Sequence, residues 1–205
     1  MMELNPFLSV WTQPKETVRQ FIKNDKLGYT MILVSIAGIG GMIASLQDSG
    51  WFQDLSLAFW IIGIFIAGII SGFLNLGINS LLYTLIGKLY GGHGRTRDMA
   101  VAIGPMMIPQ IFVVPVLIFY VLLFGERFFA APEGFDLTSI PVGAYLFLLL
   151  LMLVTGIWSI VISSKAIGVV HGFSSMRGFG VFMTIVGIFI ILMLIIIIGI
   201  FMFIF

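Results

Sequence analysis

Long runs of apolar residues constrain this chain more than any other feature of its sequence. Each run is long enough to cross a bilayer, which takes about 20 residues of helix, and the central portions of the runs contain no charged residue. The chain is 60% hydrophobic and only 9% charged, whereas soluble proteins carry about 25% charged residues. The sequence therefore predicts an all-α, polytopic integral membrane protein with five transmembrane helices, at residues 27–46, 55–89, 99–124, 140–164 and 178–205.

The second run is long for a single span, because 35 residues of helix measure about 50 Å against a hydrocarbon core of about 30 Å. Neither a charge nor a proline lies between Trp60 and Tyr83, so nothing there favours a turn. We therefore expect one helix that projects beyond the bilayer. Trp60 and Tyr83 lie 23 residues apart and are expected in the aromatic belts at the two interfaces.

Basic residues lie on alternate connectors, and this sets the expected orientation. Cytoplasmic segments of membrane proteins are enriched in Lys and Arg, so the N-terminus is predicted to be cytoplasmic and the C-terminus outside. An odd number of spans agrees with termini on opposite sides. Nine of the ten basic residues follow the pattern: Lys15, Arg19, Lys23, Lys26, Lys88, Arg95, Arg97, Lys165 and Arg177.

Two units follow from this layout, a cytoplasmic segment at residues 1–26 and a five-helix domain at residues 27–205. In the first unit, Val18, Phe21 and Ile22 recur at helical spacing among basic residues. This stripe predicts a short amphipathic helix that lies in the interface. The segment is too polar to be the apolar core of a signal peptide.

The sequence lacks the residues that most kinds of catalysis, metal binding and ion-coupled transport require. The chain has no cysteine and no ionisable residue in the central part of any run, which argues against ion-coupled transport. His93 and His171 fall in connectors and are expected to be solvated loop residues rather than metal ligands. We find no motif of a hydrolase or a nucleotide-binding site, so we expect no enzyme, no cofactor, no metal and no nucleic-acid partner.

Small and polar residues recur every three or four positions on one face of the second run. Glycines spaced four apart let helix backbones approach closely, and amide side chains need hydrogen-bond partners in hydrocarbon. The fourth run repeats the theme. Gln110 could donate to a carbonyl oxygen that a proline leaves free, or to Asn75 or Asn79. Two interpretations stay open, helix-packing contacts or a small polar cavity open to the cytoplasm. The candidates are Gly68, Gly72, Asn75, Asn79, Tyr83, Gln110, Thr155, Ser159 and Ser163.

Three prolines in the third run, Pro105, Pro109 and Pro115, predict a kinked span, because each removes a helical hydrogen bond. After the second run, Gly91 and Gly92 stand close to Arg95 and Arg97. This cluster is either a tight turn or a site for an anion or lipid headgroup. The last run is apolar on all sides from residue 185 onward and is expected to face lipid at the periphery.

The order of several short motifs resembles the Ypt-interacting-protein (YIP) domain family. The resemblance covers nearly the whole chain. It rests on Asn-Pro-Phe at 5–7, Trp-Thr-Gln-Pro-Lys-Glu-Thr at 11–17, Leu-Tyr-Gly-Gly-His-Gly at 89–94, Gly-Pro at 104–105, Trp158 and Ser-Ser-Lys-Ala at 163–166.

The resemblance implies a five-span protein with a cytoplasmic N-terminus, and it offers no catalytic residues. Eukaryotic members reside in Golgi and ER membranes and associate with Rab-type GTPases and with one another. Prokaryotic members include proteins thought to assist export or envelope-stress systems. Because only 26 residues precede the first run, we expect a prokaryotic member in the plasma membrane, and a Rab partner only in a eukaryote.

The sequence thus predicts a non-enzymatic protein that acts by helix-mediated association. Its expected partners are the lipid bilayer and either itself or another membrane protein complex, for example an exporter. It would serve as an accessory or scaffold of a transport, trafficking or envelope-stress system. The alternative is a channel or transporter with a small polar cavity that faces the cytoplasm.

Overall fold

The computed structural model describes residues 4–51 and 57–204, and its regular structure there is entirely helical. Two short helices, α1 (Pro6–Thr12) and α2 (Pro14–Lys23), precede the long ones. The long helices are α3 (Leu27–Leu46), α4 (Leu57–Leu89), α5 (Thr96–Ile111), α6 (Val114–Phe124), α7 (Val142–His171) and α8 (Ser175–Ile204), with a 3-10 turn, η1 (Gly125–Phe129), after α6.

Four of these helices, α3, α4, α7 and α8, are long and apolar enough to cross a membrane. The pair α5 and α6 provides a fifth candidate, bent by 42°. The break falls at Phe112 and Val113, and Pro115 stands at the start of α6, where its missing N–H costs no helical bond. The predicted kink is confirmed. The side of the membrane on which each terminus lies stays a prediction.

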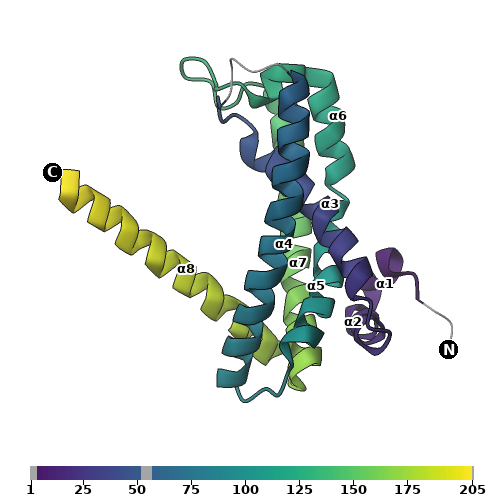
Figure 1. Ribbon diagram of the computed structural model, residues 1–205. Coiled ribbons are helices and arrows are strands. Elements are labelled where there is room, and N and C mark those ends of the chain that lie inside the picture. The colour runs from purple at the N-terminus through teal and green to yellow at the C-terminus, as the bar shows by residue number, and fades with distance from the viewer. Residues whose placement is uncertain (1–3, 52–56, 205) are drawn as a thin grey trace.

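The helices run up and down between two ends of the bundle (Figure 1). We call one the basic end, which holds α1, α2, the connector at residues 90–95 and the start of α8; the opposite end is the acidic end. The fourth run extends further than expected, because α7 continues to His171. Lys165 therefore lies inside a helix, and the connector shrinks to residues 172–174. Asp54, an acidic residue of the connector between the first two runs, lies outside the described residues.

Two apolar clusters hold the ends of the bundle. The cluster at the basic end includes Phe21, Met99 and Ile167, and the cluster at the acidic end includes Trp60 and Phe128. Trp60 stacks on Phe129 with ring centroids 5.5 Å apart. The expectation of aromatic belts at Trp60 and Tyr83 is wrong, because both side chains are only 8% exposed and lie inside the protein.

At the acidic end, Asp48 fastens two connectors to each other. Its carboxylate accepts hydrogen bonds from the Ser139 N–H at 2.8 Å and from the Thr138 hydroxyl at 3.2 Å. The Asp48 N–H in turn donates to the Phe128 carbonyl oxygen at 3.2 Å. These bonds hold the residues after α3 against those before α7.

The N-terminal helices dock on the bundle. The apolar stripe of α2 faces α5 and α7, and there Val18 and Phe21 are buried. Trp11 at the end of α1 stacks on Trp158 of α7 with centroids 6.2 Å apart and meets Phe112 edge-on at 5.5 Å. Protein, rather than lipid alone, therefore covers the stripe that the sequence assigns to the interface.

The last helix, α8, leaves the bundle (Figure 1). Near its start Gly178 lies so close to α7 that a Cβ atom there would come within 2.0 Å of the Ser164 carbonyl oxygen. Tyr90 also holds this part, with its hydroxyl 2.8 Å from Thr184 Oγ1. Beyond Ile185 the burial ends, and residues 188–203 are exposed on every side. The helix is peripheral, as its composition predicts.

Candidate functional site

The glycines of α4 bring this helix against α3. A Cβ atom at Gly72 would lie 2.3 Å from the Val34 carbonyl oxygen, and one at Gly68 would lie 2.6 Å from Ile39 Cα. On α3, a Cβ atom at Gly38 would lie 2.2 Å from the Gly68 carbonyl oxygen. Because the obstacles are backbone atoms, no side chain fits at these positions. The two glycines spaced four residues apart on α4 therefore pack against another helix of the same chain.

Past Gly72, the polar face of α4 lines a cavity of about 250 Å³, which we call the amide cavity. Helices α5 and α7 form its other walls, and Phe182 of α8 lies at its edge. Residues that the sequence places on separate helices meet here: Asn75, Asn79 and Tyr83 on α4, Gln110 on α5, and Ser159 and Ser163 on α7.

These polar side chains do not pair with one another. Within residues 4–51 and 57–204, the amides of Asn75, Asn79 and Gln110 have no hydrogen-bond partner in the protein. The Ser159 hydroxyl oxygen is buried and also lacks one. The expectation that Gln110 or a neighbouring helix satisfies the asparagines is therefore wrong. Helix packing leaves a space between them instead.

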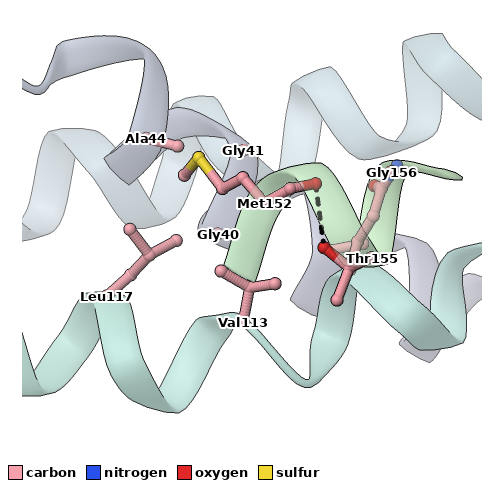
Figure 2. A pocket seen from close by; sticks show the side chains of 10 residues that line it. Gly40, Gly41, Ala44, Val113, Leu117, Met152, Thr155 and Gly156 are labelled. Carbon is pink, nitrogen blue, oxygen red and sulfur yellow. Dashed lines mark hydrogen bonds between the residues drawn. The ribbon is translucent and has the colours of Figure 1, made fainter. Parts of the chain in front are cut away.

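Two further cavities share Gln110 with the amide cavity. One, of about 170 Å³, lies between α3, α4 and α5 next to Gly72 and Asn75. The other, of about 300 Å³, is lined by α3, α6 and α7, and we call it the apolar cavity. Figure 2 shows Val113, in the break before α6, and Leu117 of α6 on one side of it and Met152 of α7 on another.

Thr155 does not add a free polar group to the apolar cavity. Its hydroxyl donates to the Leu151 and Met152 carbonyl oxygens of its own helix, at 2.8 and 3.2 Å, and the second of these bonds is visible in Figure 2. The lining is otherwise aliphatic, apart from Gln110.

The prolines of α5 are accommodated by α3. Pro105 leaves the Val101 carbonyl oxygen without its helical donor, and the Thr30 hydroxyl donates to this oxygen at 2.9 Å. Gly104 makes the approach possible, because a Cβ atom there would lie 2.4 Å from Thr30 Oγ1. Beyond Gln110 the chain turns into α6, and the three cavities meet beside this bend.

The amide cavity is closed toward the basic end and open at mid-depth. Tyr83 and Ser163 on the basic side are buried, whereas Asn75, Gln110 and Gly156 on the other side are exposed. Asn75 lies 14 residues before the end of α4, which is about 21 Å of helix. The exposed part of the lining therefore lies at mid-bundle, and an opening to the cytoplasm stays a prediction.

The cavity lining carries no charge. Among the described residues that line the three cavities, none is Asp, Glu, Lys, Arg or His. Residues 4–51 and 57–204 also contain no group of three or more His, Cys, Asp or Glu that could hold a metal ion. The chemistry available here is hydrogen bonding by neutral amides and hydroxyls.

At the basic end, His171 is buried and not solvated, which corrects the sequence expectation. Its Nδ1 accepts a hydrogen bond from the Gly94 N–H at 3.2 Å, and its Nε2 lies 3.1 Å from the Tyr83 carbonyl oxygen. Because Nδ1 is an acceptor, Nε2 carries the proton and donates to Tyr83, so the ring is neutral. Phe173 stacks on it with centroids 5.3 Å apart. His93 is exposed, as expected.

The glycines around this ring leave the space in which it is buried. The N–H groups of Gly91 and Gly92 donate to the Lys88 and Gly87 carbonyl oxygens, both at 3.0 Å. They end α4 and are not turned toward an external anion. Arg97 forms an ion pair with Asp25, and Arg95 is exposed. An anion site at this connector stays a prediction that rests on the arginine side chains.

Comparison with known proteins decides the family. A family model described as the Yip1 domain matches residues 8–198. The chain belongs to the Yip1 family. No curated protein and no solved structure matches it. The Yip1 match runs from α1 into α8 and so includes both the cavities and the His171 contacts.

Members of the Yip1 family are associated with membrane trafficking and are not known as enzymes, and this chain is a multi-pass membrane protein of that family. Sequence reasoning missed the burial of His171 in this Yip1 domain. A signal was available, since Gly87, Gly92 and Gly94 lie near the end of one span and His171 near the end of another at the same end of the bundle. Sequence reasoning named Trp158 only as a motif residue and missed the burial of its indole Nε1, which has no hydrogen-bond partner among the described residues.

Proposed function

We propose that this protein works without chemistry of its own, as an accessory or scaffold that associates with other membrane proteins. The exposed length of α8 supports this proposal most. Residues 188–200 present large apolar side chains on every face, and the helix stands apart from the bundle (Figure 1). A transmembrane helix of a second copy, or of a transport, trafficking or envelope-stress complex, could pack along it.

Site-specific photo-crosslinking in native membranes tests the association. A benzophenone amino acid is placed on α8 at Ile191 or Ile195, and at the control position Ile70 on α4, which is also exposed. We expect the same membrane protein, or a second copy of the chain, to be captured from both α8 positions and not from Ile70. Equal capture from all three positions would show that α8 meets only random neighbours.

A second function, binding in the amide cavity, is supported by the polar groups that lack partners there. Such a cavity is what a channel or a transporter requires, although the buried residues Tyr83 and Ser163 close it toward the basic end. The two functions are compatible, because the cavity lies inside the bundle and the exposed part of α8 lies outside it.

Cysteine labelling tests the cavity, and the chain has no native cysteine. A cysteine at Asn79 is expected to react with a small membrane-permeant thiol reagent, and one at Ile162, which is 0% exposed, is not. Reaction of the Asn79 cysteine with an impermeant reagent added from either side would favour a conducting path. Complete protection from the permeant reagent would show that the helices are packed shut.

A further inference from the structure

We propose that the amide cavity and the apolar cavity together bind a neutral lipid with a glycerol-ester head, such as a diacylglycerol. The inference rests on the cavity function proposed above and extends it by naming the ligand class. Its starting point is the set of polar side chains at Asn75, Asn79, Gln110 and Ser159 that have no partner among the described residues. The Ser159 hydroxyl oxygen is buried, whereas Asn75 and Gln110 are exposed at mid-depth. A polar group without a partner is unfavourable in hydrocarbon whether it is buried in protein or faces lipid, so several side by side indicate a ligand from outside the chain.

The absence of charge in the lining selects an uncharged ligand. A phosphate or an ammonium group would enter this region without a counter-charge, and an unpaired ion is strongly disfavoured in a medium of low dielectric constant. Asparagine and glutamine amides both donate and accept, as do the hydroxyls of Tyr83 and Ser163. Ester carbonyl oxygens and a free hydroxyl, which make up the head of a diacylglycerol, match these groups.

The position of the opening selects a ligand that arrives from the bilayer. On the basic side, the buried residues Tyr83 and Ser163 close the amide cavity. At mid-depth it opens beside Asn75, where the neighbouring Leu74 and Ile78 expose apolar surface. A lipid without a charged headgroup can reach this depth, whereas a water-soluble molecule would have to pass the closed side.

The linings of the two cavities match the two parts of a lipid, because the amide cavity is polar and the adjoining cavity is apolar. They meet at Gln110, and the apolar cavity beyond it is lined by Val113, Leu117 and Met152 (Figure 2). The Thr155 hydroxyl there is already bonded to its own helix. The amide cavity, of about 250 Å³, would hold roughly eight water molecules, which is enough space for a glycerol unit and its esters. An acyl chain would continue into the apolar cavity.

Photo-labelling of the full chain in phosphatidylcholine vesicles tests the ligand. The probe is a diacylglycerol with a diazirine on one acyl chain, and the labelled peptides are mapped by mass spectrometry. We expect labels on α6 and α7 around the apolar cavity, with loss of labelling when unlabelled dioleoylglycerol is added in excess. Dioleoyl phosphatidic acid, which has the same chains and a charged head, should not compete.

Two matched variants test the polar contacts. Ser163→Ala removes a hydroxyl that lines the amide cavity, and Ser164→Ala removes its neighbour, whose hydroxyl donates to the Ile160 carbonyl oxygen at 2.7 Å and does not line it. We expect labelling to fall in Ser163→Ala and to be retained in Ser164→Ala. If Ser163→Ala fails to fold, Asn79→Leu serves instead, because it removes an amide that has no partner to lose.

Three outcomes would overturn the proposal. Labelling that dioleoylglycerol does not displace would mean random contact with lipid. Competition by soluble glycerol would assign the cavity to an aqueous solute, and equal competition by phosphatidic acid would remove the requirement for a neutral head. If the Asn79 cysteine reacts with the permeant reagent while the lipid fails to bind, the cavity function stands and only the ligand class is wrong. If that cysteine is protected, the cavity function itself fails.

Discussion

A single imidazole ring joins three segments at the basic end, and glycines provide the room for it. A Cβ atom at Gly87, Gly92 or Gly94 would come within 2.2 to 2.9 Å of a His171 ring atom. The ring also bonds to the Tyr83 carbonyl oxygen and to the Gly94 N–H. The ends of α4 and α7 are therefore fixed to each other by one neutral histidine.

Replacing one of these glycines should loosen the end of the bundle. In Gly92→Ala the new methyl group would lie 2.4 Å from His171 Nδ1, and such overpacking costs about 1–3 kcal/mol. We expect a lower melting temperature in detergent. The control is Gly77→Ala on α4, where a Cβ atom meets nothing within 4 Å and alanine favours the helix. An equal loss in both variants would contradict the role assigned to the ring.

Apolar replacement should lower stability at a polar residue that has a hydrogen-bond partner in the protein, and should not lower it at one that has none. Thr30→Val keeps the shape of the side chain but strands the Val101 carbonyl oxygen that Pro105 has freed, so it should reduce the free energy of unfolding by about 1–3 kcal/mol. Asn79→Leu removes an amide with no protein partner and should leave stability unchanged or raise it. Thermal unfolding in detergent compares the two. A large loss in Asn79→Leu would mean that its amide is bonded after all.

At the scale of the helices, the contact between α3 and α4 depends on backbone atoms. A methyl group at Gly72 would meet the Val34 carbonyl oxygen at 2.3 Å, and a backbone cannot move aside as a flexible side chain can. We expect Gly72→Ala to reduce the free energy of unfolding by about 1–3 kcal/mol or more. Gly63→Ala on the same helix, which meets nothing within 4 Å, should be neutral. The melting temperatures of the two variants in detergent decide between these outcomes.

The sequence predicted those features of the helices that depend on local spacing. The three prolines predicted the kink, although Pro105 and Pro109 lie inside α5 and the break falls just before Pro115. The polar face of α4 follows from the positions of Gly72, Asn75 and Asn79. The sequence could not predict that the amides stay unpaired. That outcome depends on how far α4, α5 and α7 lie from one another, and the distance is set by contacts elsewhere, such as those of Gly38 with α4. The burial of His171 likewise requires knowing that two helix ends meet.

At the scale of the whole molecule, the distribution of charge predicts the orientation. A reporter that is active only outside the cytoplasm should be active when fused after Phe205 and inactive when fused before Met2. Insertions in the connectors provide the controls: the reporter should be active at residues 131–136 and inactive at residues 172–174. Activity at both termini would contradict an odd number of crossings.

Because α8 is packed on the bundle near its start and exposed along residues 188–203, we expect its tilt to adjust to the bilayer. The helix has 30 residues, about 45 Å in length, whereas the hydrocarbon core is about 30 Å thick. Spin labels at Ile198 and at Leu149 on α7 should change their separation when the vesicle lipids have longer acyl chains. Labels at Leu74 and Leu149, both within the bundle, should not. A constant distance in both pairs would show that α8 is held rigidly.

A helix that is fixed near one end and free along the rest is expected to change its tilt with the thickness of the membrane. Because α8 is packed on the protein only through residues 175–187, the bilayer sets the course of the remainder. We expect the helix to lie flatter in a thin membrane and to stand more upright in a thick one, with the cavities and the His171 contacts unchanged. The angle between α8 and the bundle would therefore differ between membranes of different thickness. A partner that binds both α8 and the bundle at one angle would bind the protein only in membranes of matching thickness.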